Sequence, residues 1–236
     1  MQTTTYIIGN WKANKTTAEA KAWFKATSKL PRLSTNLKIV LCVPFIHLRL
    51  LQNQTAIKSG VQDISPYPDG AYTGAISARM LAGEIDFAIL GHSERRDYFH
   101  ETNQQIAAKA TQALEYKITP VIGVSQKNWR QQLNQLSSDQ RKKSIVMFEP
   151  PEAISRQIGP IGVGSAAPID EVVAVVEKIK SEFPEAPVLY GGSVKASNIS
   201  TYLKQSIIDG VVPGSASLNA SEWLKLLTLS QKIRGK

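Results

Sequence analysis

Residues 87–96 read Phe-Ala-Ile-Leu-Gly-His-Ser-Glu-Arg-Arg, so four apolar residues are followed directly by a glycine and by polar and charged side chains. A short apolar run without alternation is typical of a strand that is buried on both faces of a parallel sheet. Seven further runs of this kind occur along the chain at nearly regular spacing: Tyr6–Ile8, Lys38–Val43, Gly60–Gln62, Pro120–Ile122, Ile145–Phe148, Pro187–Tyr190 and Gly210–Val212. The pattern predicts eight strands of one parallel sheet.

Helical patterns with recognisable starts fill the intervals between these runs. Thr16 or Thr17 can cap the first helix, and Thr102 precedes a long alanine- and glutamine-rich helical pattern. Pro168 suits the first position of a later helix, and the last helix is expected to include residues 221–229. We therefore expect a helix after most strands.

Eight strand-then-helix units within 236 residues predict an α/β fold, a single (β/α)8 barrel that spans residues 1–236 as one domain. The competing architecture is an open doubly wound sheet. Its nucleotide-binding version requires a Gly-x-Gly-x-x-Gly turn at the start of the first helix, and the sequence has none there.

Composition restricts the cellular setting. The one cysteine, Cys42, lies in an apolar run and indicates a buried structural thiol in a reducing compartment. Residues 1–5 lack the charged and apolar regions of a signal peptide, and no apolar run is long enough to span a bilayer. We expect a cytoplasmic protein with no membrane partner.

The chain carries a net charge of +9, which raises the question of nucleic-acid binding. However, the lysines and arginines are dispersed, and the densest cluster, Arg141–Lys143, has no aromatic residues interleaved with it. This distribution favours a solvated basic surface that attracts a small anion over a nucleic-acid site.

In a barrel of parallel strands, functional side chains gather after the C-terminal ends of the strands. The first strand is followed by Asn10 and Lys12, an amide and a cation that suit a carbonyl-bearing or anionic ligand. The fourth strand is followed by His92, where the N-terminus of the next helix favours the neutral imidazole. The charges that follow it, residues 94–97, are expected to pair with one another beside the buried strand.

The sixth strand ends at Glu149, which leaves an apolar run and is therefore partly desolvated. Desolvation raises the proton affinity of a carboxylate and makes it a better base. Two prolines follow it and stiffen the chain, as a hinge requires. The long glycine-bearing segment at residues 157–165 fits a lid over the site or a surface insertion.

Small residues follow the last two strands, at residues 191–194 and 213–217. Glycine and serine at neighbouring strand ends let backbone N–H groups approach a ligand, and these two loops frequently bind phosphate in barrels. The three histidines, His47, His92 and His100, do not form a metal-ligand spacing with Cys42 or with each other, so we expect no metal and no cofactor.

Taken together, these segments resemble a known family. Gly9–Lys12, Leu90–Arg96, Glu149-Pro150, Tyr190–Val194 and Gly214–Leu218 are similar, in order, to the signature segments of triosephosphate isomerases, as are Gly70–Gly74 and Phe99–Thr102. The resemblance covers essentially the whole chain. It implies a TIM barrel and an aldose–ketose isomerase that needs no cofactor and acts on a small phosphorylated triose.

The resemblance also implies roles for the matching residues. Glu149 would be the base that moves a proton between adjacent carbons of glyceraldehyde 3-phosphate and dihydroxyacetone phosphate. His92 would polarise the carbonyl oxygens as a neutral donor, and Lys12 would stabilise the enediolate and the phosphate. Asn10 would hold the carbonyl end, and Glu94 would orient Lys12. A glutamate base with a neutral histidine and a closing loop is the general scheme described for this enzyme.

The phosphate would be bound by Ser193 and by the backbone N–H groups of Gly214 and Ser215, and Ser93 would support the catalytic groups. A further phosphate contact from the lid would come from Ser155 or Gly162. The hinge sequence Pro150–Ser155 differs from the usual form of the family, so the residues leave both choices open.

Three further positions differ from the family pattern. Ser215 replaces a glycine, Ala75 stands where glutamate is common, and Asp63 stands where asparagine is usual. The last two lie in or near the loop through which subunits of this family pack. The resemblance implies a homodimer, with a tetramer as the alternative, and we expect its interface to differ from the usual one.

Two other functions remain open at this point. One is an isomerase or epimerase of a different phosphate-binding barrel type. The other is a barrel that has lost catalysis and binds an anionic partner, which the net charge of +9 would favour.

Overall fold

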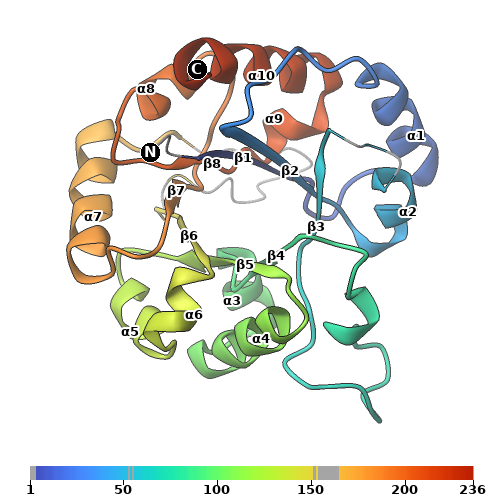
Figure 1. The fold of residues 1–236 in the computed structure, drawn as a ribbon, viewed down its shortest axis with the longest axis vertical. Coiled ribbons are helices and arrows are strands. Elements are labelled where there is room, and N and C mark those ends of the chain that lie inside the picture. Colours follow the sequence, from blue (N-terminus) through green and yellow to red (C-terminus); the bar gives the residue numbers. More distant parts are fainter. Residues whose placement is uncertain (1–3, 53, 55, 151–152, 154–164, 236) are drawn as a thin grey trace.

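The computed structural model describes residues 4–52, 54, 56–150, 153 and 165–235. Within them, eight parallel strands form a closed barrel in sequence order, with helices around it (Figure 1). The barrel closes where β1 pairs with β8, with Tyr6 opposite Gly210 and Ile7 opposite Val211. The strands are β1 (Thr5–Asn10), β2 (Leu37–Cys42), β3 (Lys58–Val61), β4 (Phe87–Leu90), β5 (Thr119–Val124), β6 (Ile145–Phe148), β7 (Val188–Tyr190) and β8 (Gly210–Val211). The prediction of a (β/α)8 barrel is confirmed.

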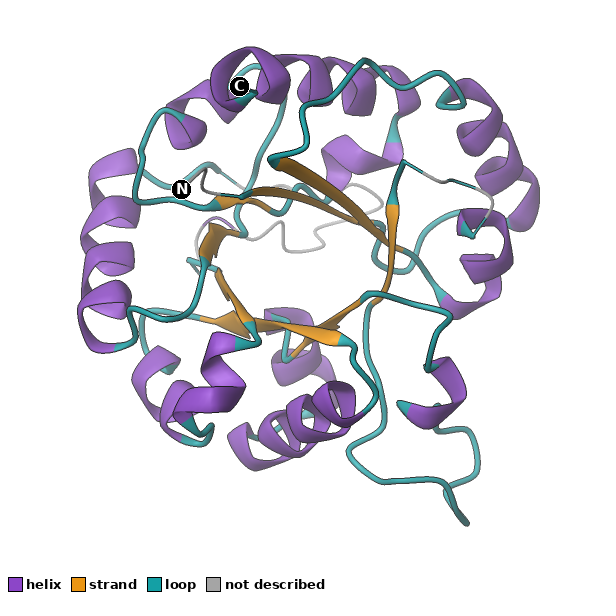
Figure 2. Cartoon of the chain, in the orientation of Figure 1, coloured by secondary structure: helices purple, strands orange, loops and turns teal. Residues whose placement is uncertain are grey.

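Helices form a ring outside the strands, as the colouring by secondary structure in Figure 2 makes clear. They are α1 (Thr17–Ala26), α2 (Leu48–Leu51), α3 (Ser93–Phe99), α4 (Asn103–Glu115), α5 (Trp129–Asn134), α6 (Ser138–Lys142), α7 (Ile169–Glu182), α8 (Ile199–Leu203), α9 (Ser215–Leu218) and α10 (Ala220–Arg234), with 3-10 turns η1 (Phe45–His47) and η2 (Arg79–Leu81). None of those in the described part of the chain combines the length and the apolar character that a bilayer crossing requires.

The predicted helix starts are largely confirmed. Thr16 caps α1 and Thr102 caps α4, each in a reciprocal capping box with the residue three positions later. Pro168 is the N-cap of α7, and the helix begins at Ile169, one residue later than the sequence predicts. Its extended backbone, with ψ of 136°, explains this, because the chain turns into the helix only after the proline.

The apolar runs are continuous because both faces of each strand are buried, one inside the barrel and the other against the surrounding helices. One set of side chains fills the inside of the barrel, among them Ile8, Val40, Ile89 and Met147. The alternate residues pack outward against the helices. The expectation of a buried Cys42 is confirmed, since its thiol is free and points into the inner set. A Cβ at Gly60 would lie 2.5 Å from this sulfur, which explains the glycine in β3.

The connection between β3 and β4 projects from the barrel, at the lower right of Figure 1. Tyr67 and Tyr72 lie in this segment and are about half exposed, and their rings stack at a centroid distance of 4.6 Å. Stacking of the two rings gives the segment a small apolar contact of its own although it extends away from the core.

Candidate functional site

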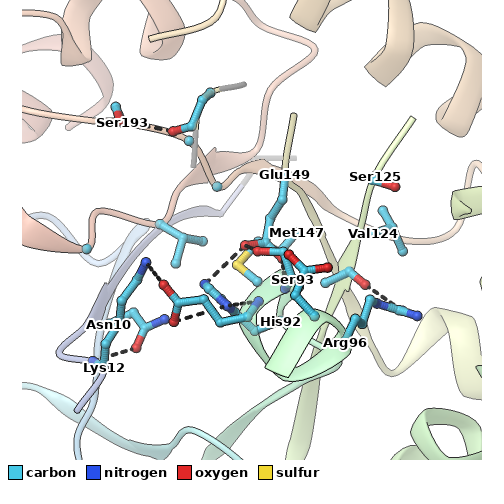
Figure 3. Close-up of a pocket in the computed structure, with 18 of the residues that line it drawn as sticks. Asn10, Lys12, His92, Ser93, Arg96, Val124, Ser125, Met147, Glu149 and Ser193 are labelled. Carbon is cyan, nitrogen blue, oxygen red and sulfur yellow. Dashed lines mark hydrogen bonds and ion pairs between the residues drawn. The ribbon is translucent and has the colours of Figure 1, made fainter. Parts of the chain in front are cut away.

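A cavity of about 700 Å³ opens at the C-terminal ends of the strands. Residues at the ends of β1, β4, β6, β7 and β8 line it, including Asn10, Lys12, His92, Glu149 and Ser193. Figure 3 shows the Lys12, His92 and Glu149 side chains converging from separate strands. The cavity therefore lies where the sequence places chemistry in a parallel barrel.

Glu149 follows β6 and is 2% exposed. Its carboxylate accepts hydrogen bonds from the backbone N–H of Ser93 at 3.0 Å and from the Ser93 hydroxyl at 3.2 Å. Burial raises the pKa of Glu149 to about 8, although the Ser93 donors and the charge of Lys12 act in the opposite direction. Such a carboxyl group exchanges its proton near neutral pH, which suits a general base.

His92 is the N-cap of α3 and accepts a hydrogen bond at Nδ1 from the backbone N–H of Glu94, at 3.2 Å. The proton of the neutral ring is therefore on Nε2, which lies 3.1 Å from Oε1 of Glu149. Burial, helped by the positive charges of Lys12 and Arg95, lowers the pKa of His92 to about 3. The imidazole is thus a neutral donor that points into the cavity.

Lys12 lies just after β1 and forms an ion pair with Glu94, with Nζ 2.5 Å from Oε1. Its backbone has a φ of 51°, in the left-handed region that non-glycine residues seldom adopt. The Asn10 side chain holds this conformation, because its Oδ1 accepts a hydrogen bond from the Lys12 N–H at 3.0 Å. The strained backbone aims a cation into the cavity, as often occurs at functional sites.

Ser193, Gly214 and Ser215 lie on the same cavity wall, at the ends of β7 and β8. Gly214 is the N-cap of α9, and Ser215 is its first residue, so free N–H groups of the first turn are oriented for an anion. A Cβ on Gly214 would lie 3.5 Å from Cε of Lys12, so the glycine and the cation are neighbours. The Ser193 hydroxyl donates a hydrogen bond to the carbonyl oxygen of Ala153 at 3.0 Å.

The other two candidate phosphate contacts, Ser155 and Gly162, lie outside the described residues, as does most of the candidate lid at residues 151–167. The described part of that segment ends at Ala167. Its N–H donates to the Tyr190 hydroxyl at 3.0 Å, and its carbonyl oxygen accepts from the Tyr202 hydroxyl at 2.9 Å.

Comparison with known proteins identifies the family. The sequence profile of triosephosphate isomerase matches residues 5–230. The chain belongs to the triosephosphate isomerase family. It is 37% identical to the triosephosphate isomerase of Mesomycoplasma hyorhinis, over 96% of this chain and 99% of that protein. It is 34% identical to those of Alkaliphilus oremlandii, over 94% and 97% of the two chains, and of Gloeobacter violaceus, over 94% and 96%.

The expectation from the sequence that the chain is a triosephosphate isomerase family member, and hence an isomerase, is therefore confirmed. The cavity at the C-terminal strand ends is thus the site of a triosephosphate isomerase family member. These relatives differ from this chain at about two thirds of the aligned positions.

One prediction about the site is wrong. The charges at residues 94–97 do not pair with one another. Glu94 pairs with Lys12, and Arg95 pairs with Asp63 and Glu101, at 2.8 and 2.5 Å. The helix α3 projects consecutive side chains in different directions, so neighbours in sequence reach partners on other elements.

Arg96 and Gly123 are parts of the cavity wall that sequence reasoning missed. A Cβ on Gly123 would lie 2.7 Å from Oε2 of Glu149 and 2.7 Å from the carbonyl oxygen of Gly91. Gly123 thus leaves room for the Glu149 carboxylate. The signal available in the sequence was a glycine inside the apolar run of β5, since such a glycine often marks a close approach by another group.

Proposed function

We propose that this isomerase interconverts dihydroxyacetone phosphate and D-glyceraldehyde 3-phosphate, the step that links the two triose phosphates in glycolysis and gluconeogenesis. One catalytic domain at residues 1–236 performs the reaction, and the proton moves between adjacent carbons through an enediolate. The observation that carries the proposal is the meeting of a buried carboxylate and a neutral imidazole at 3.1 Å in a cavity that also contains a lysine.

Glu149 removes the proton from the substrate carbon and returns it to the neighbouring carbon. The raised pKa of about 8 supports this role, because a carboxylate with that proton affinity can both accept and release a proton near neutral pH. The carboxylate also has to exchange its hydrogen bonds from Ser93 for contact with the substrate. Ser93 is therefore a supporting residue that holds the base before the substrate reaches it.

The enediolate carries negative charge on oxygen, and His92, Lys12 and Asn10 surround the space that it would occupy. Nε2–H of His92, which faces Glu149, would donate to the substrate oxygens. A neutral imidazole is a suitable donor here because it stabilises negative charge on the substrate oxygen without giving up its proton as readily as an imidazolium would. Glu94 orients the Lys12 ammonium through their ion pair.

The phosphate of the substrate would bind to Ser193 and to the N–H groups of Gly214 and Ser215. Their place in the lining of the same cavity as Glu149 supports this, as does the proximity of Lys12 to Gly214. Ser155 or Gly162 remains the proposed source of a further amide from the segment outside the described residues.

A coupled assay of purified protein with each triose phosphate, in the presence of a chelator and without added cofactor, tests the proposal. We expect turnover in both directions, and the Glu149→Gln variant is the control for a contaminating isomerase. Activity toward other sugar phosphates with none toward triose phosphates would instead support a different barrel isomerase or epimerase. Salt-sensitive nucleic-acid binding without any isomerase activity would overturn the assignment of function.

We also propose that the protein is a homodimer. Large apolar side chains are exposed after three neighbouring strands: Ile46 after β2, Tyr67, Tyr72 and Met80 after β3, and Tyr98 and Phe99 after β4. Exposed apolar side chains on several neighbouring connections are typical of a protein–protein interface. Sedimentation velocity distinguishes the dimer from a monomer and from a tetramer.

A cytoplasmic location completes the proposal. It is supported by Cys42, which is a free thiol in the barrel interior. Proteins of reducing compartments keep such thiols unpaired. Fractionation of the source cells, followed by immunodetection, would test it.

A further inference from the structure

Arg96 lies on α3, on the side of Glu149 that faces away from Asn10 and Lys12 in Figure 3. Its guanidinium donates to two backbone carbonyl oxygens, that of Gly91 at 2.9 Å and that of Gly123 at 3.0 Å. It also donates to Oδ1 of Asn103 at 2.8 Å and to Oε1 of Gln132 at 2.9 Å. All four acceptors are neutral.

The two carbonyl groups belong to the strand ends that carry or contact the catalytic pair. Gly91 is followed directly by His92, and its φ of 64° sets the turn from β4 into α3. Gly123, in β5, lies against the Glu149 carboxylate, since a Cβ at this position would come within 2.7 Å of Oε2. One planar guanidinium therefore connects the backbone before His92 with the backbone beside Glu149.

The charge of Arg96 has no carboxylate in direct contact among the residues that the structure describes. The acceptor closest in shape to a carboxylate is the amide of Gln132, a side chain that is 0% exposed on α5. Burial lowers the pKa of Arg96, and the charges of Glu149 and Glu101 oppose that effect. A half-buried cation without an ion pair still acts on neighbouring charges, because a local dielectric below that of water screens it less.

Other charged and titratable groups also face the Glu149 carboxylate. Lys12 approaches from β1, and His92 and Glu94 approach from α3. Lys12 is already paired with Glu94, so its charge is partly compensated. Arg96 is the cation near Glu149 whose described contacts are all neutral.

We propose that Arg96 is a positioning residue of this active site, which fixes Glu149 and His92 relative to each other through Gly123 and Gly91 and whose unpaired charge favours the ionised base. The inference rests on the proposed function, in which Glu149 is the base. Arg96 thus makes two separable contributions: the planar guanidinium positions the two side chains, and its charge favours the ionised carboxylate. Gln132 preserves the contribution of the charge, because its amide oxygen binds the guanidinium without neutralising it.

Two substitutions separate the contributions. Gln132→Glu keeps Arg96 and its grip on both carbonyl groups but places a carboxylate on the guanidinium. Arg96→Lys keeps the charge but cannot reproduce the planar set of donors. Gln131→Glu is the matched control, because it adds the same charge to the exposed face of the same helix.

Two quantities are measured: the pH profile of kcat/KM and the titration of the Glu149 carboxyl group. The titration is monitored by 13C NMR in protein labelled at glutamate, and the Glu149 signal is assigned by its absence from the Glu149→Gln variant. We expect Gln132→Glu to move the acid limb and the Glu149 titration upward by about half a pH unit or more, with kcat at high pH retained. We expect Arg96→Lys to lower kcat at least about tenfold while the acid limb of the kcat/KM profile stays in place. Misplacing the two side chains then raises the activation free energy by about 1.4 kcal/mol, which corresponds to a tenfold loss of rate.

The proposal is overturned if Gln132→Glu titrates like the Gln131→Glu control and Arg96→Lys retains kcat within a factor of about two. A purely structural Arg96 would change thermal stability without moving the Glu149 titration. The titration does not depend on turnover, so it remains informative if the wild-type protein fails to isomerise triose phosphates, which would refute the proposed function separately.

Discussion

Replacing Glu149 with glutamine is expected to reduce activity by orders of magnitude and, at the same time, to stabilise the fold. The substitution keeps the shape of the side chain and removes its charge. The pKa of Glu149 is raised from 4.5 to about 8, chiefly by burial. At about 1.36 kcal/mol per pH unit, ionising this carboxyl in the folded protein costs up to about 5 kcal/mol relative to the unfolded chain.

The sign of the pH dependence follows from proton binding. Between pH 4.5 and about 8, the folded protein binds a proton at Glu149 that the unfolded chain has released. The free energy of unfolding of the wild type therefore loses this contribution as the pH rises through that window. The Glu149→Gln variant lacks the group, so its excess stability is small at pH 5, grows toward pH 8 and is constant above.

Urea denaturation at pH 5, 6, 7, 8 and 9, at one fixed protomer concentration, measures this difference. We expect the excess stability of the variant over the wild type to grow by at least about 1 kcal/mol between pH 5 and pH 8. This is less than the full cost of ionising Glu149, because the structure relaxes around a buried charge. Glu177→Gln, on the exposed face of α7, is the control and should show no such trend. In the coupled assay, loss of the proposed base should reduce kcat by about 10²–10⁴-fold.

A stability difference between Glu149→Gln and wild type that is flat or shrinks from pH 5 to pH 8 would refute the reasoning. It would mean that the folded protein does not hold Glu149 at a raised pKa. Full activity in the variant would refute the separate claim that Glu149 is the base.

The pKa of His92 is lowered to about 3, so its ring should remain neutral from pH 9 down to about pH 4, with 15N NMR showing Nε2 protonated throughout. An imidazole that titrates near pH 6.5 would contradict this. Gly123→Ala should reduce kcat by at least about tenfold, because its Cβ would lie 2.7 Å from the Glu149 carboxylate and would displace the base; unchanged kinetics would show that the carboxylate has other room. Replacing both Tyr67 and Tyr72 with serine should shift sedimentation toward the monomer if the projecting segment is an interface, whereas an unchanged dimer would place the interface elsewhere.

The sequence by itself determined the architecture and the location of the site. Continuous apolar runs at regular spacing require strands that are buried on both faces, and eight of them with intervening helices favour a closed barrel. In such a barrel all C-terminal strand ends share one face. Asn10, Lys12, His92 and Glu149 could therefore be assigned to one site from their positions after strands alone.

Only the tertiary structure decided how these groups affect one another. The pKa values of Glu149 and His92 depend on burial by the whole barrel and on Ser93, which is 56 residues from Glu149 in the chain. The partners of Arg95 and Arg96 likewise lie on other elements, so adjacent residues on α3 have unrelated environments. Local pattern determines which residues face the site, because periodicity is a property of the backbone; charge and proton affinity are set by neighbours that only folding brings together.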